Sequence, residues 1–320
     1  MEPKLKKYLQ NSFKILVSII ILYFLISQIG FDKIIQTLSG TNLSILLLAV
    51  PLKIVALLLT TLNISVLLKG IKKKISLWKL FITSNLAWSI GLFLPGRLGE
   101  FSLIYFLKKH DVTIGEGTAI TLLDKISTFI VLSIISVLAI VTYFDFNTAL
   151  KFGTILLIIL VLSIVMLSSS RTRDFIKKHF LKSYSKLFTG FNESLKMILH
   201  QKVLFCTNLL ITTIKWFFSF LLIKIIFTSL GVQVSIIDVS FITSLAMLIS
   251  LIPISIGGLG VRESIAVYLF NNLSVKPEVT LSVYLINTLL NYLFGFLLLL
   301  TNLNKLGRKE TKTQELKDEN

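Results

Sequence analysis

The sequence LPGRLGE at residues 94–100 interrupts a strongly apolar segment with a proline, two glycines, an arginine and a glutamate. A second interruption, PISIGGLGVRE at residues 253–263, also ends in an arginine and a glutamate. In a bilayer, backbone groups freed by such breaks must be satisfied by other protein or by a water-filled cavity. Paired Gly/Pro breaks in matching positions of two halves are typical of substrate sites in secondary transporters. The candidate hairpin breaks are Pro95, Gly96, Gly99, Pro253, Gly257, Gly258 and Gly260.

The composition predicts an all-α integral membrane protein with one polytopic domain over residues 1–320. Hydrophobic residues make up 54% of the 320 residues and the mean hydropathy is +0.84, which is too apolar for a soluble domain. The apolar run at 15–29 is followed by no small-residue cleavage site, so we interpret it as a retained helix. The single cysteine, Cys206, excludes an internal disulfide. The histidines fall in predicted polar loops, so we expect no metal ion and no cofactor.

Six apolar runs are long enough to cross a membrane as helices, which takes about 20 residues. They are residues 15–29, 43–68, 118–144, 152–167, 203–230 and 281–303. Two further apolar regions, 80–107 and 241–270, contain the breaks. Lys and Arg in short loops stay on the cytoplasmic side, and reading both broken regions as re-entrant hairpins places 24 of the 33 Lys and Arg on one side. We therefore predict six full spans plus two hairpins, countable as about eight transmembrane helices, with both termini cytoplasmic in the cell membrane of a prokaryote.

This topology makes the two halves of the chain inverted repeats. Residues 1–144 contain two spans, a hairpin entering from inside and a span, and residues 145–303 repeat the order with a hairpin entering from outside. Such repeats place the substrate near the bilayer midplane. Residues 171–202 predict a basic amphipathic helix on the inner leaflet, with a solvated bridging helix as the alternative. Residues 304–320 form a polar cytoplasmic tail. The basic residues are spread along one side of the membrane, which does not indicate nucleic-acid binding.

Ionisable residues inside the predicted membrane segments carry a positive surplus. A charge at the centre of a membrane helix costs about 2.5 to 3.5 kcal/mol, so such residues usually mark pathways or paired sites. Lys53 and Lys215 lie at equivalent depths in the second span of each half, which predicts a central cavity lined by both repeats, whereas Lys224 suits snorkelling to the surface. The nine groups are Lys53, Arg97, Lys125, Lys215, Lys224, Arg262, Glu100, Asp124 and Glu263.

These charges favour an anionic substrate. Arginine and helix N-termini both suit phosphate, although each arginine and glutamate could instead pair to staple its hairpin. Adjacent helical residues point about 100° apart, so we expect Asp124 and Lys125 to find partners on other helices. Asn287 and Asn291 share one face of the last span, either at the site or as helix–helix contacts. The predicted substrate-binding residues are Arg97, Glu100, Arg262, Glu263, Asp124, Lys125, Lys53, Lys215, Asn287 and Asn291, and we expect no catalytic residue.

Three sequence runs resemble the lysylphosphatidylglycerol synthase transmembrane region family: PGRLGE at 95–100, LLDK at 122–125 and, most specifically, GGLGVRE at 257–263. The resemblance covers nearly the whole chain. It implies a flippase-like membrane domain, which in two-part synthases moves aminoacylated phosphatidylglycerol while a separate soluble domain transfers the amino acid. We expect no such soluble domain in this protein, so the resemblance does not imply synthase activity. The pair at 124 and 125 is Asp-Lys, where the family commonly has a Glu-Arg type pair.

The sequence leaves three hypotheses. The leading one is a flippase or transporter for an anionic or aminoacylated phospholipid, or for a polyprenyl-phosphate-linked lipid, with membrane lipids as its partners. The second is an intramembrane enzyme acting on a lipid phosphate, for which only Asp124, Glu100 and Glu263 offer acid–base groups. The third is an accessory subunit for a separately encoded lipid-modifying or glycosyl-transferring enzyme. The oligomeric state is not predicted.

Overall fold

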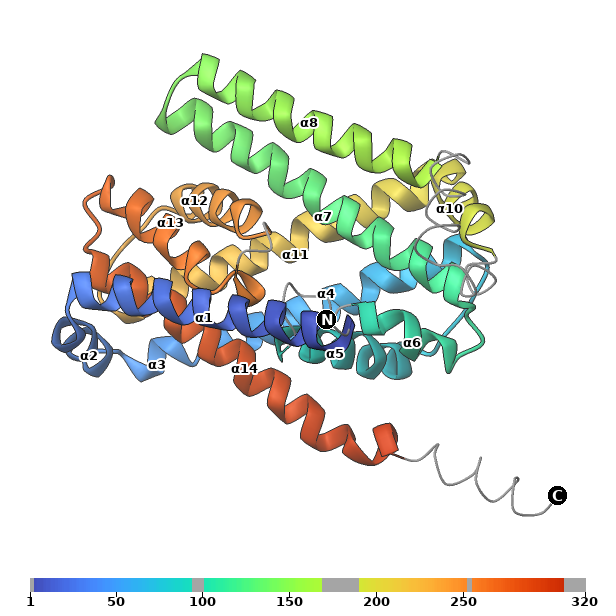
Figure 1. Cartoon of the computed structure of the whole chain (residues 1–320), viewed down its shortest axis with the longest axis horizontal. Coiled ribbons are helices and arrows are strands. Elements are labelled where there is room, and N and C mark those ends of the chain that lie inside the picture. The colour runs from blue at the N-terminus through green and yellow to red at the C-terminus, as the bar shows by residue number, and fades with distance from the viewer. Residues whose placement is uncertain (1–2, 94–100, 169–189, 252–254, 308–320) are drawn as a thin grey trace.

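The computed structural model describes residues 3–93, 101–168, 190–251 and 255–307, which form helices and no strand. The long helices cross the molecule at different slopes (Figure 1). In chain order they are α1 (Pro3–Ile29), α2 (Phe31–Ser39), α3 (Leu43–Leu46), α4 (Ala49–Gly70), α5 (Leu77–Phe93), α6 (Ser102–Lys108), α7 (Ile114–Tyr143), α8 (Phe146–Ser168), α10 (Phe191–His200), α11 (Lys202–Ser229), α12 (Ile236–Ile249), α13 (Val261–Asn271) and α14 (Pro277–Gly307), with a 3₁₀ turn η4 (Ile256–Gly258) before α13.

Within the described part of the chain, four helical segments are long and apolar enough to cross a membrane, namely Leu43–Gly70, Ile114–Tyr143, Lys202–Ser229 and Pro277–Asn302. They coincide with four of the six spans predicted from the sequence. The apolar part of α1 continues into α2 with a bend of 82°, so this pair is a fifth candidate or a broken segment. The apolar part of α8, Phe146–Leu162, is shorter. The prediction of an all-helical membrane protein is therefore confirmed, and the count of six spans stays a prediction.

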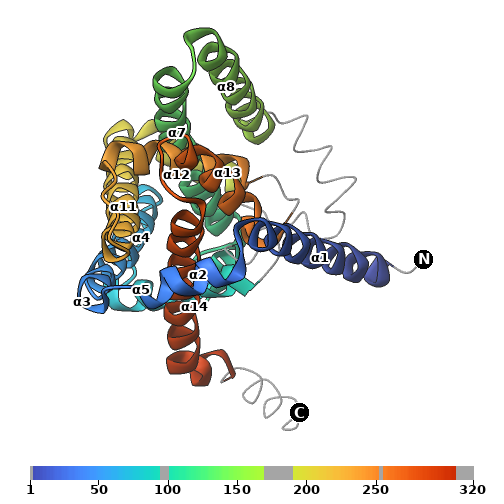
Figure 2. The same cartoon turned by 90° about the vertical axis from the view of Figure 1, so that its left-hand side faces the viewer.

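Helices α4 and α11 form an antiparallel pair. At one end, the backbone N–H of Asn42, just before α3, donates to the carbonyl of Ser229 at the end of α11, with a distance of 2.7 Å. At the other end, the side-chain amide of Gln201 donates to the carbonyl of Gly70 at 2.8 Å. The two helices lie side by side when the molecule is turned by 90°, with α1 and α8 far from them at the edge of the bundle (Figure 2). The second long helices of the two halves thus pack along their length.

The broken apolar regions form two pairs of shorter helices. The segment after α6 returns to the first half of α5. His110 Nε2, just after α6, lies 3.3 Å from the hydroxyl of Thr83 on α5. The ammonium group of Lys73, just before α5, donates to the carbonyl of Asp111 at 2.8 Å. Helices α12 and α13 likewise pack against each other (Figure 1). The predicted break at 94–100, with Pro95, Gly96, Gly99, Arg97 and Glu100, lies outside the described residues, as does Pro253.

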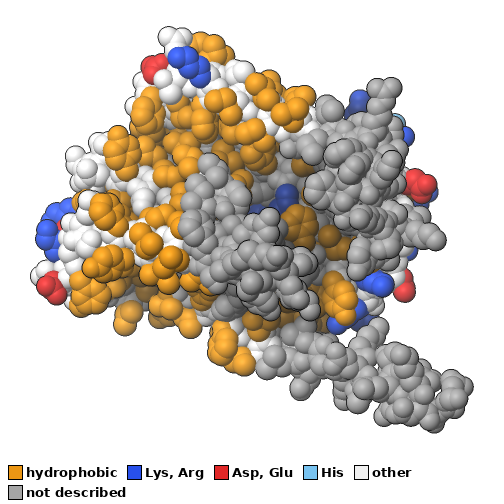
Figure 3. All heavy atoms as spheres, in the orientation of Figure 1, with side chains coloured by type: hydrophobic (Ala, Val, Ile, Leu, Met, Phe, Trp, Pro, Cys, Tyr) orange, Lys and Arg blue, Asp and Glu red, His pale blue; other side chains and the backbone are white. Residues whose placement is uncertain are grey.

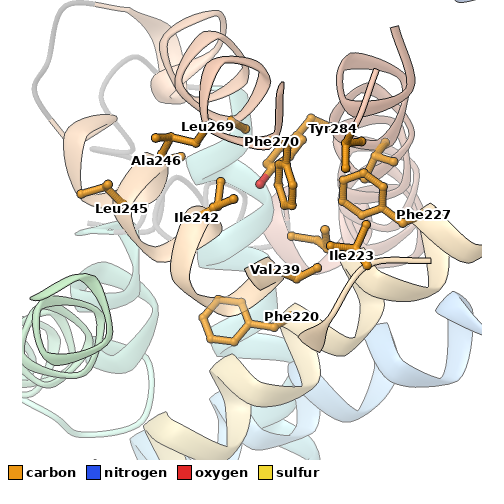
Figure 4. Packing of buried hydrophobic residues seen from close by; sticks show 14 of the residues in the cluster. Phe220, Ile223, Phe227, Val239, Ile242, Leu245, Ala246, Leu269, Phe270 and Tyr284 are labelled. Carbon is orange, nitrogen blue, oxygen red and sulfur yellow. The ribbon is translucent and has the colours of Figure 1, made fainter. Parts of the chain in front are cut away.

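The largest core cluster joins α7, α11, α12, α13 and α14 (Figure 4). Phe227 on α11 and Phe270 on α13 have ring centroids 4.9 Å apart, and both side chains are fully buried. Tyr284 on α14 is also buried and its hydroxyl lies 2.9 Å from that of Thr243 on α12. Aromatic packing therefore fixes α12 and α13 against the long helices, which positions the residues that follow the second break.

The outer surface is strongly apolar. Large hydrophobic side chains of α1, α8 and α14 are exposed, including Tyr23, Leu157 and Leu297. Hydrophobic atoms cover much of the upper and left parts of the visible face; most of the charged side chains seen on it lie at its edges, and one blue group is visible near the centre (Figure 3). Exposed apolar area of this extent suits contact with lipid.

Helix α10 is the described part of the predicted basic amphipathic helix. Its apolar face was expected to lie on the inner leaflet, but in the structure it is buried against protein. Phe191, Leu195 and Ile198 are buried in a core cluster with residues of α4 and α7. This face therefore contacts protein rather than lipid, because α10 packs across the ends of both helices. Residues 171–189 of the predicted helix lie outside the described part of the chain.

Candidate functional site

A cavity of about 220 Å³, lined by both polar and apolar side chains, lies among the helices of the bundle. Its walls come from four long helices, α4, α7, α11 and α14, and from both broken pairs, α5 with α6 and α12 with α13. Both halves of the chain therefore contribute side chains to one site. The predicted residues that line it are Lys53, Asp124, Lys125, Lys215, Arg262, Asn287 and Asn291.

Lys53 reaches the cavity from α4. Its ammonium nitrogen donates to the side-chain oxygen of Asn291 on α14 at 2.5 Å. The same nitrogen lies 4.2 Å from the ring centroid of Trp88 on α5, within the range of a cation–π contact. Lys53 thus contacts residues of two other helices, α5 and α14, at the cavity wall. Asn291, predicted to lie either at the site or in a helix–helix contact, accepts a hydrogen bond from this charged group at the cavity.

Arg262 and Glu263 form a buried ion pair after the second break. The arginine is 7% exposed and the glutamate 1%, and the guanidinium hydrogen-bonds the Glu263 carboxylate through both Nε, at 3.1 Å, and Nη2. Nη2 also donates to the hydroxyl of Thr288 on α14 at 2.8 Å. The other carboxylate oxygen accepts from the backbone N–H of Gly260 at 2.7 Å. Glu263 thus caps α13 and holds Arg262 at the cavity. Arg262 therefore pairs with Glu263 and also lines the cavity, so the two alternatives predicted for it are both met.

Asp124 and Lys125 contact each other, which corrects the expectation that neighbouring positions would keep them apart. The Lys125 ammonium lies 3.2 Å from a carboxylate oxygen of Asp124, because a four-carbon side chain can bend back across a 100° separation. Asp124 also has the predicted partner on another helix. The side-chain amide of Asn63 on α4 donates to its other oxygen at 2.8 Å.

A buried polar network that the sequence analysis missed extends from this carboxylate. Asn63 accepts from the amide of Asn208 on α11 at 2.7 Å and donates to the hydroxyl of Thr212 at 3.1 Å. Ser127 on α7 donates to the oxygen of Asn208 at 2.5 Å. All of these side chains are at most 5% exposed. The sequence signal that could have indicated this network is the spacing of Asn208 and Thr212, which lie four residues apart on one face of a helix.

Aromatic side chains also line the cavity without having been predicted. Trp216 stands on α11 next to Lys215, and its buried indole N–H has no hydrogen-bond partner within the described ranges. The Arg262 guanidinium lies 5.7 Å from the ring centroid of Tyr284. Lys224 is not among the cavity residues. No group of three or more His, Cys, Asp or Glu in the described part of the chain is placed to hold a metal ion.

The fold and the site together define a multi-pass helical membrane protein with a charge-lined cavity inside its bundle. Residues 11–298 match the lysylphosphatidylglycerol synthase TM region family, and the chain belongs to that family. The resemblance seen in the sequence is therefore confirmed.

The chain is also similar to archaeal membrane proteins. It is 24% identical over 304 residues to a UPF0104 membrane protein of Methanothermobacter thermautotrophicus, which covers 87% of this chain and 90% of the relative. It is 21% identical over 333 residues to a UPF0104 membrane protein of Methanocaldococcus jannaschii, covering 96% of this chain and 99% of the relative. The similarity thus extends over most of the length of both relatives.

Proposed function

We propose that this protein moves a lipid between the two leaflets of the cell membrane and binds the lipid headgroup in the central cavity. The candidate substrates are anionic or aminoacylated phospholipids and polyprenyl-phosphate-linked lipids. The observation that carries the proposal is that Lys53, Lys125, Lys215 and Arg262 line one internal cavity. Four cationic side chains on the walls of one cavity suit a phosphate-bearing ligand, because charge-assisted hydrogen bonds from Lys and Arg to phosphate are strong.

The proposal includes a re-entrant topology. In the proposal, α5 with α6 enters from the cytoplasmic side, α12 with α13 enters from the outside, and both termini are cytoplasmic. The antiparallel pairing of α4 with α11 fits inverted repeats over residues 1–144 and 145–303, because equivalent helices of such repeats cross in opposite directions. The substrate site would then open alternately to each leaflet.

Each group in the cavity has a place in this mechanism. Lys53, Lys215 and Arg262 bind the phosphate, and Asn287 and Asn291 add polar contacts from α14. Asp124 orients Lys125 or meets an amine on the headgroup. Arg97 and Glu100 keep their predicted role beside the first break. The acyl or prenyl chains stay in the lipid, since the exposed surface of the bundle is apolar.

The proposal is tested by reconstitution into vesicles. Fluorescent phosphatidylglycerol, lysyl-phosphatidylglycerol and phosphatidic acid are placed in separate preparations, and the fraction accessible to an impermeant quencher is followed with time. We expect faster exchange for at least one lipid than in protein-free vesicles. Lys53→Gln should slow the exchange by about tenfold or more, because it removes the charge-assisted hydrogen bond proposed between Lys53 and the lipid phosphate.

The matched control is Lys224→Gln, which makes the same change on α11 away from the cavity and should exchange lipid at the wild-type rate. Equal rates in the protein-free, wild-type and Lys53→Gln vesicles for every lipid would contradict lipid transport. Recovery of a soluble lipid-modifying enzyme together with the purified protein would then favour the accessory-subunit hypothesis, and chemically altered lipid would favour an enzyme.

A further inference from the structure

A second cavity, the α5–α6 groove, lies apart from the candidate site and has a volume of about 410 Å³. Basic and apolar residues line it, including Trp78, Lys79, Ile82, Phe106, Lys109 and His110. Thr83 and Leu86 of α5 face this groove, whereas Ser84 and Trp88 of the same helix face the central cavity. Helix α5 therefore stands between the two cavities.

The wall of the groove is mostly apolar. Phe106 and Leu86 are buried there, and Trp78 at the rim is 70% exposed. The Trp78 ring stacks on Phe81 with ring centroids 5.7 Å apart, which supports it at the surface. Exposed tryptophan next to apolar residues is typical of the membrane–water interface. The groove thus offers an apolar wall to a lipid chain at the level of the headgroups.

Two lysines stand at one end of the groove. Lys79 lies in the first turn of α5, Lys109 follows the last residue of α6, and both are exposed. The Lys109 ammonium lies 5.5 Å from the ring centroid of Phe106 and 5.6 Å from that of Tyr105, within the range of cation–π contacts. Neither lysine is ion-paired with a carboxylate among the residues that the structure describes. The aromatic contacts place the Lys109 ammonium beside the apolar wall.

His110 connects the two helices at the same end. Its Nε2 lies 3.3 Å from the hydroxyl of Thr83 on α5. Burial and the charges of Lys79 and Lys109 lower the pKa of His110, and the charge of Asp111 opposes them. Such an effect is expected where cations from two helices lie near one imidazole. Lys79 and Lys109 therefore belong to one site, at the opposite end of both helices from residues 94–100.

This site lies at a basic end of the bundle. Lys72, Lys73 and Lys74 lie between α4 and α5, and the amide of Gln201, next to α10, bonds the carbonyl of Gly70 there. Helices α6 and α10 both lie toward the right-hand end of the molecule in Figure 1. The predicted topology makes this end cytoplasmic. Anionic lipids of the cytoplasmic leaflet attract Lys and Arg near the membrane surface.

We propose that the α5–α6 groove binds an anionic phospholipid of the inner leaflet, at a site distinct from the central cavity. The headgroup phosphate contacts Lys79 and Lys109, which are suited to charge-assisted hydrogen bonds. One acyl chain lies along Ile82 and Phe106 and continues into the bilayer. This site does not depend on lipid transport through the central cavity. Since α5 lines both cavities, a lipid in the groove supports the face of α5 opposite the candidate site.

The test uses the fluorescence of Trp78 as the reporter. The full chain is placed in phosphatidylcholine vesicles at pH 7.5 with increasing fractions of brominated phosphatidylglycerol or brominated phosphatidylcholine, whose bromine atoms quench tryptophan on contact. Subtracting the signal of Trp78→Phe removes the contributions of Trp88 and Trp216 in the central cavity. We expect half-maximal quenching at a fraction of phosphatidylglycerol about tenfold lower, as two lysines at a membrane surface can produce.

Variants test the residues, each measured with and without Trp78→Phe. Lys79→Gln with Lys109→Gln should abolish the preference for phosphatidylglycerol. The matched control is Lys74→Gln with Lys108→Gln, which removes the same charge from exposed lysines at the same end that do not line the groove. This control should retain the preference. Lys53→Gln should retain it too, since Lys53 lines the central cavity.

Three results would overturn the proposal. The first is equal quenching of Trp78 by the two brominated lipids. The second is an equal loss of preference in both lysine pairs, which would indicate diffuse attraction to surface charge. The third is stronger reversal of quenching by inorganic phosphate than by chloride at the same ionic strength, which would assign the lysines to a soluble anion.

Leaflet exchange measured in the same vesicles separates this proposal from the proposed function. Selective quenching of Trp78 without any exchange would contradict transport and leave the groove assigned to an anionic phospholipid. Exchange without selective quenching would leave transport standing and remove the lipid from the α5–α6 groove.

Discussion

The side-chain amide of Asn208 on α11 donates a 2.7 Å hydrogen bond to the side-chain oxygen of Asn63 on α4. The two residues come from different halves of the chain, and both are fully buried. Asn63 in turn donates to Asp124, the carboxylate of the cavity. One chain of hydrogen bonds thus joins the contact between the two halves to the candidate site. A substitution in this contact should therefore also affect the position of Asp124.

Asn63→Ala should destabilise the protein by about 1–3 kcal/mol, because it leaves the buried oxygen of Asp124 and the amide of Asn208 without a partner. The measurement is thermal unfolding in detergent. Thr207→Ala is the control, since this exposed hydroxyl bonds only a carbonyl of its own helix. Equal unfolding midpoints for the two variants would show that the network adds nothing to stability.

Glu263→Ala should cost about 3–5 kcal/mol, because Arg262 would remain buried without a counter-charge. Glu263→Gln should cost less, since an amide oxygen can still accept from Gly260. Changing Arg262 and Glu263 together to methionine should recover part of the loss. Denaturant unfolding of the wild type, Arg262→Met, Glu263→Met and the double variant gives the coupling energy, and strictly additive effects would argue against the ion pair.

Gly258→Ala should disturb the second break more than the same change at Gly231. Both glycines have positive φ, 81° and 78°, so each alanine carries a backbone penalty of about 1–2 kcal/mol. An added Cβ at Gly258 would lie 2.7 Å from Cβ of Ser250, whereas at Gly231 it would meet nothing within 4 Å. The difference in unfolding midpoint isolates the close contact, and no difference would mean that the turn relaxes freely.

His110 should make stability depend on pH. Burial and the charges of Lys79 and Lys109 lower the pKa of His110 below its ordinary value of 6.5, against the opposing effect of Asp111. The unfolded chain then binds more protons than the folded one, so stability falls as the pH drops through 6.5 toward the folded pKa. His110→Gln should flatten the unfolding midpoint between pH 7.5 and 5.5.

The control for this effect is Thr83→Val, which removes the hydroxyl next to His110 Nε2 but keeps the titratable ring. It should preserve the slope with pH. A slope that is unchanged in His110→Gln would assign the pH dependence to other groups.

The long apolar helices and the charged residues of the cavity were accessible from the sequence. Uninterrupted apolar runs at 43–68, 118–144, 203–230 and 281–303 exceed the length needed to cross a bilayer, so their helical state follows from composition alone. Lys53, Lys125, Lys215 and Arg262 were recognisable because a charge in an apolar run needs a partner. The expectation of a central cavity was drawn from the equivalent positions of Lys53 and Lys215 in the two halves, and in the structure all four residues line one cavity.

Other features were not accessible because they depend on side-chain reach and on neighbouring helices. The Asp124–Lys125 contact contradicts a simple angular argument, since a flexible lysine chain is longer than the separation it must cross. The buried face of α10 was interpreted as a lipid-facing surface, because apolar periodicity does not distinguish protein from lipid as the neighbour. Ordinary asparagines such as Asn63 and Asn208 gave too weak a signal to be singled out.

By itself, the sequence determined that this protein is a helical membrane protein of the lysylphosphatidylglycerol synthase TM region family, with charges where hydrocarbon would exclude them. Only the tertiary structure decided which charges share one cavity, which carboxylate neutralises which cation, and that Asn63 and Asn208 join the two halves beside the site. The physical reason is the distance along the sequence over which each effect acts. Burial in a membrane constrains each segment locally, whereas pairing of charges depends on contacts between helices that are distant in the sequence.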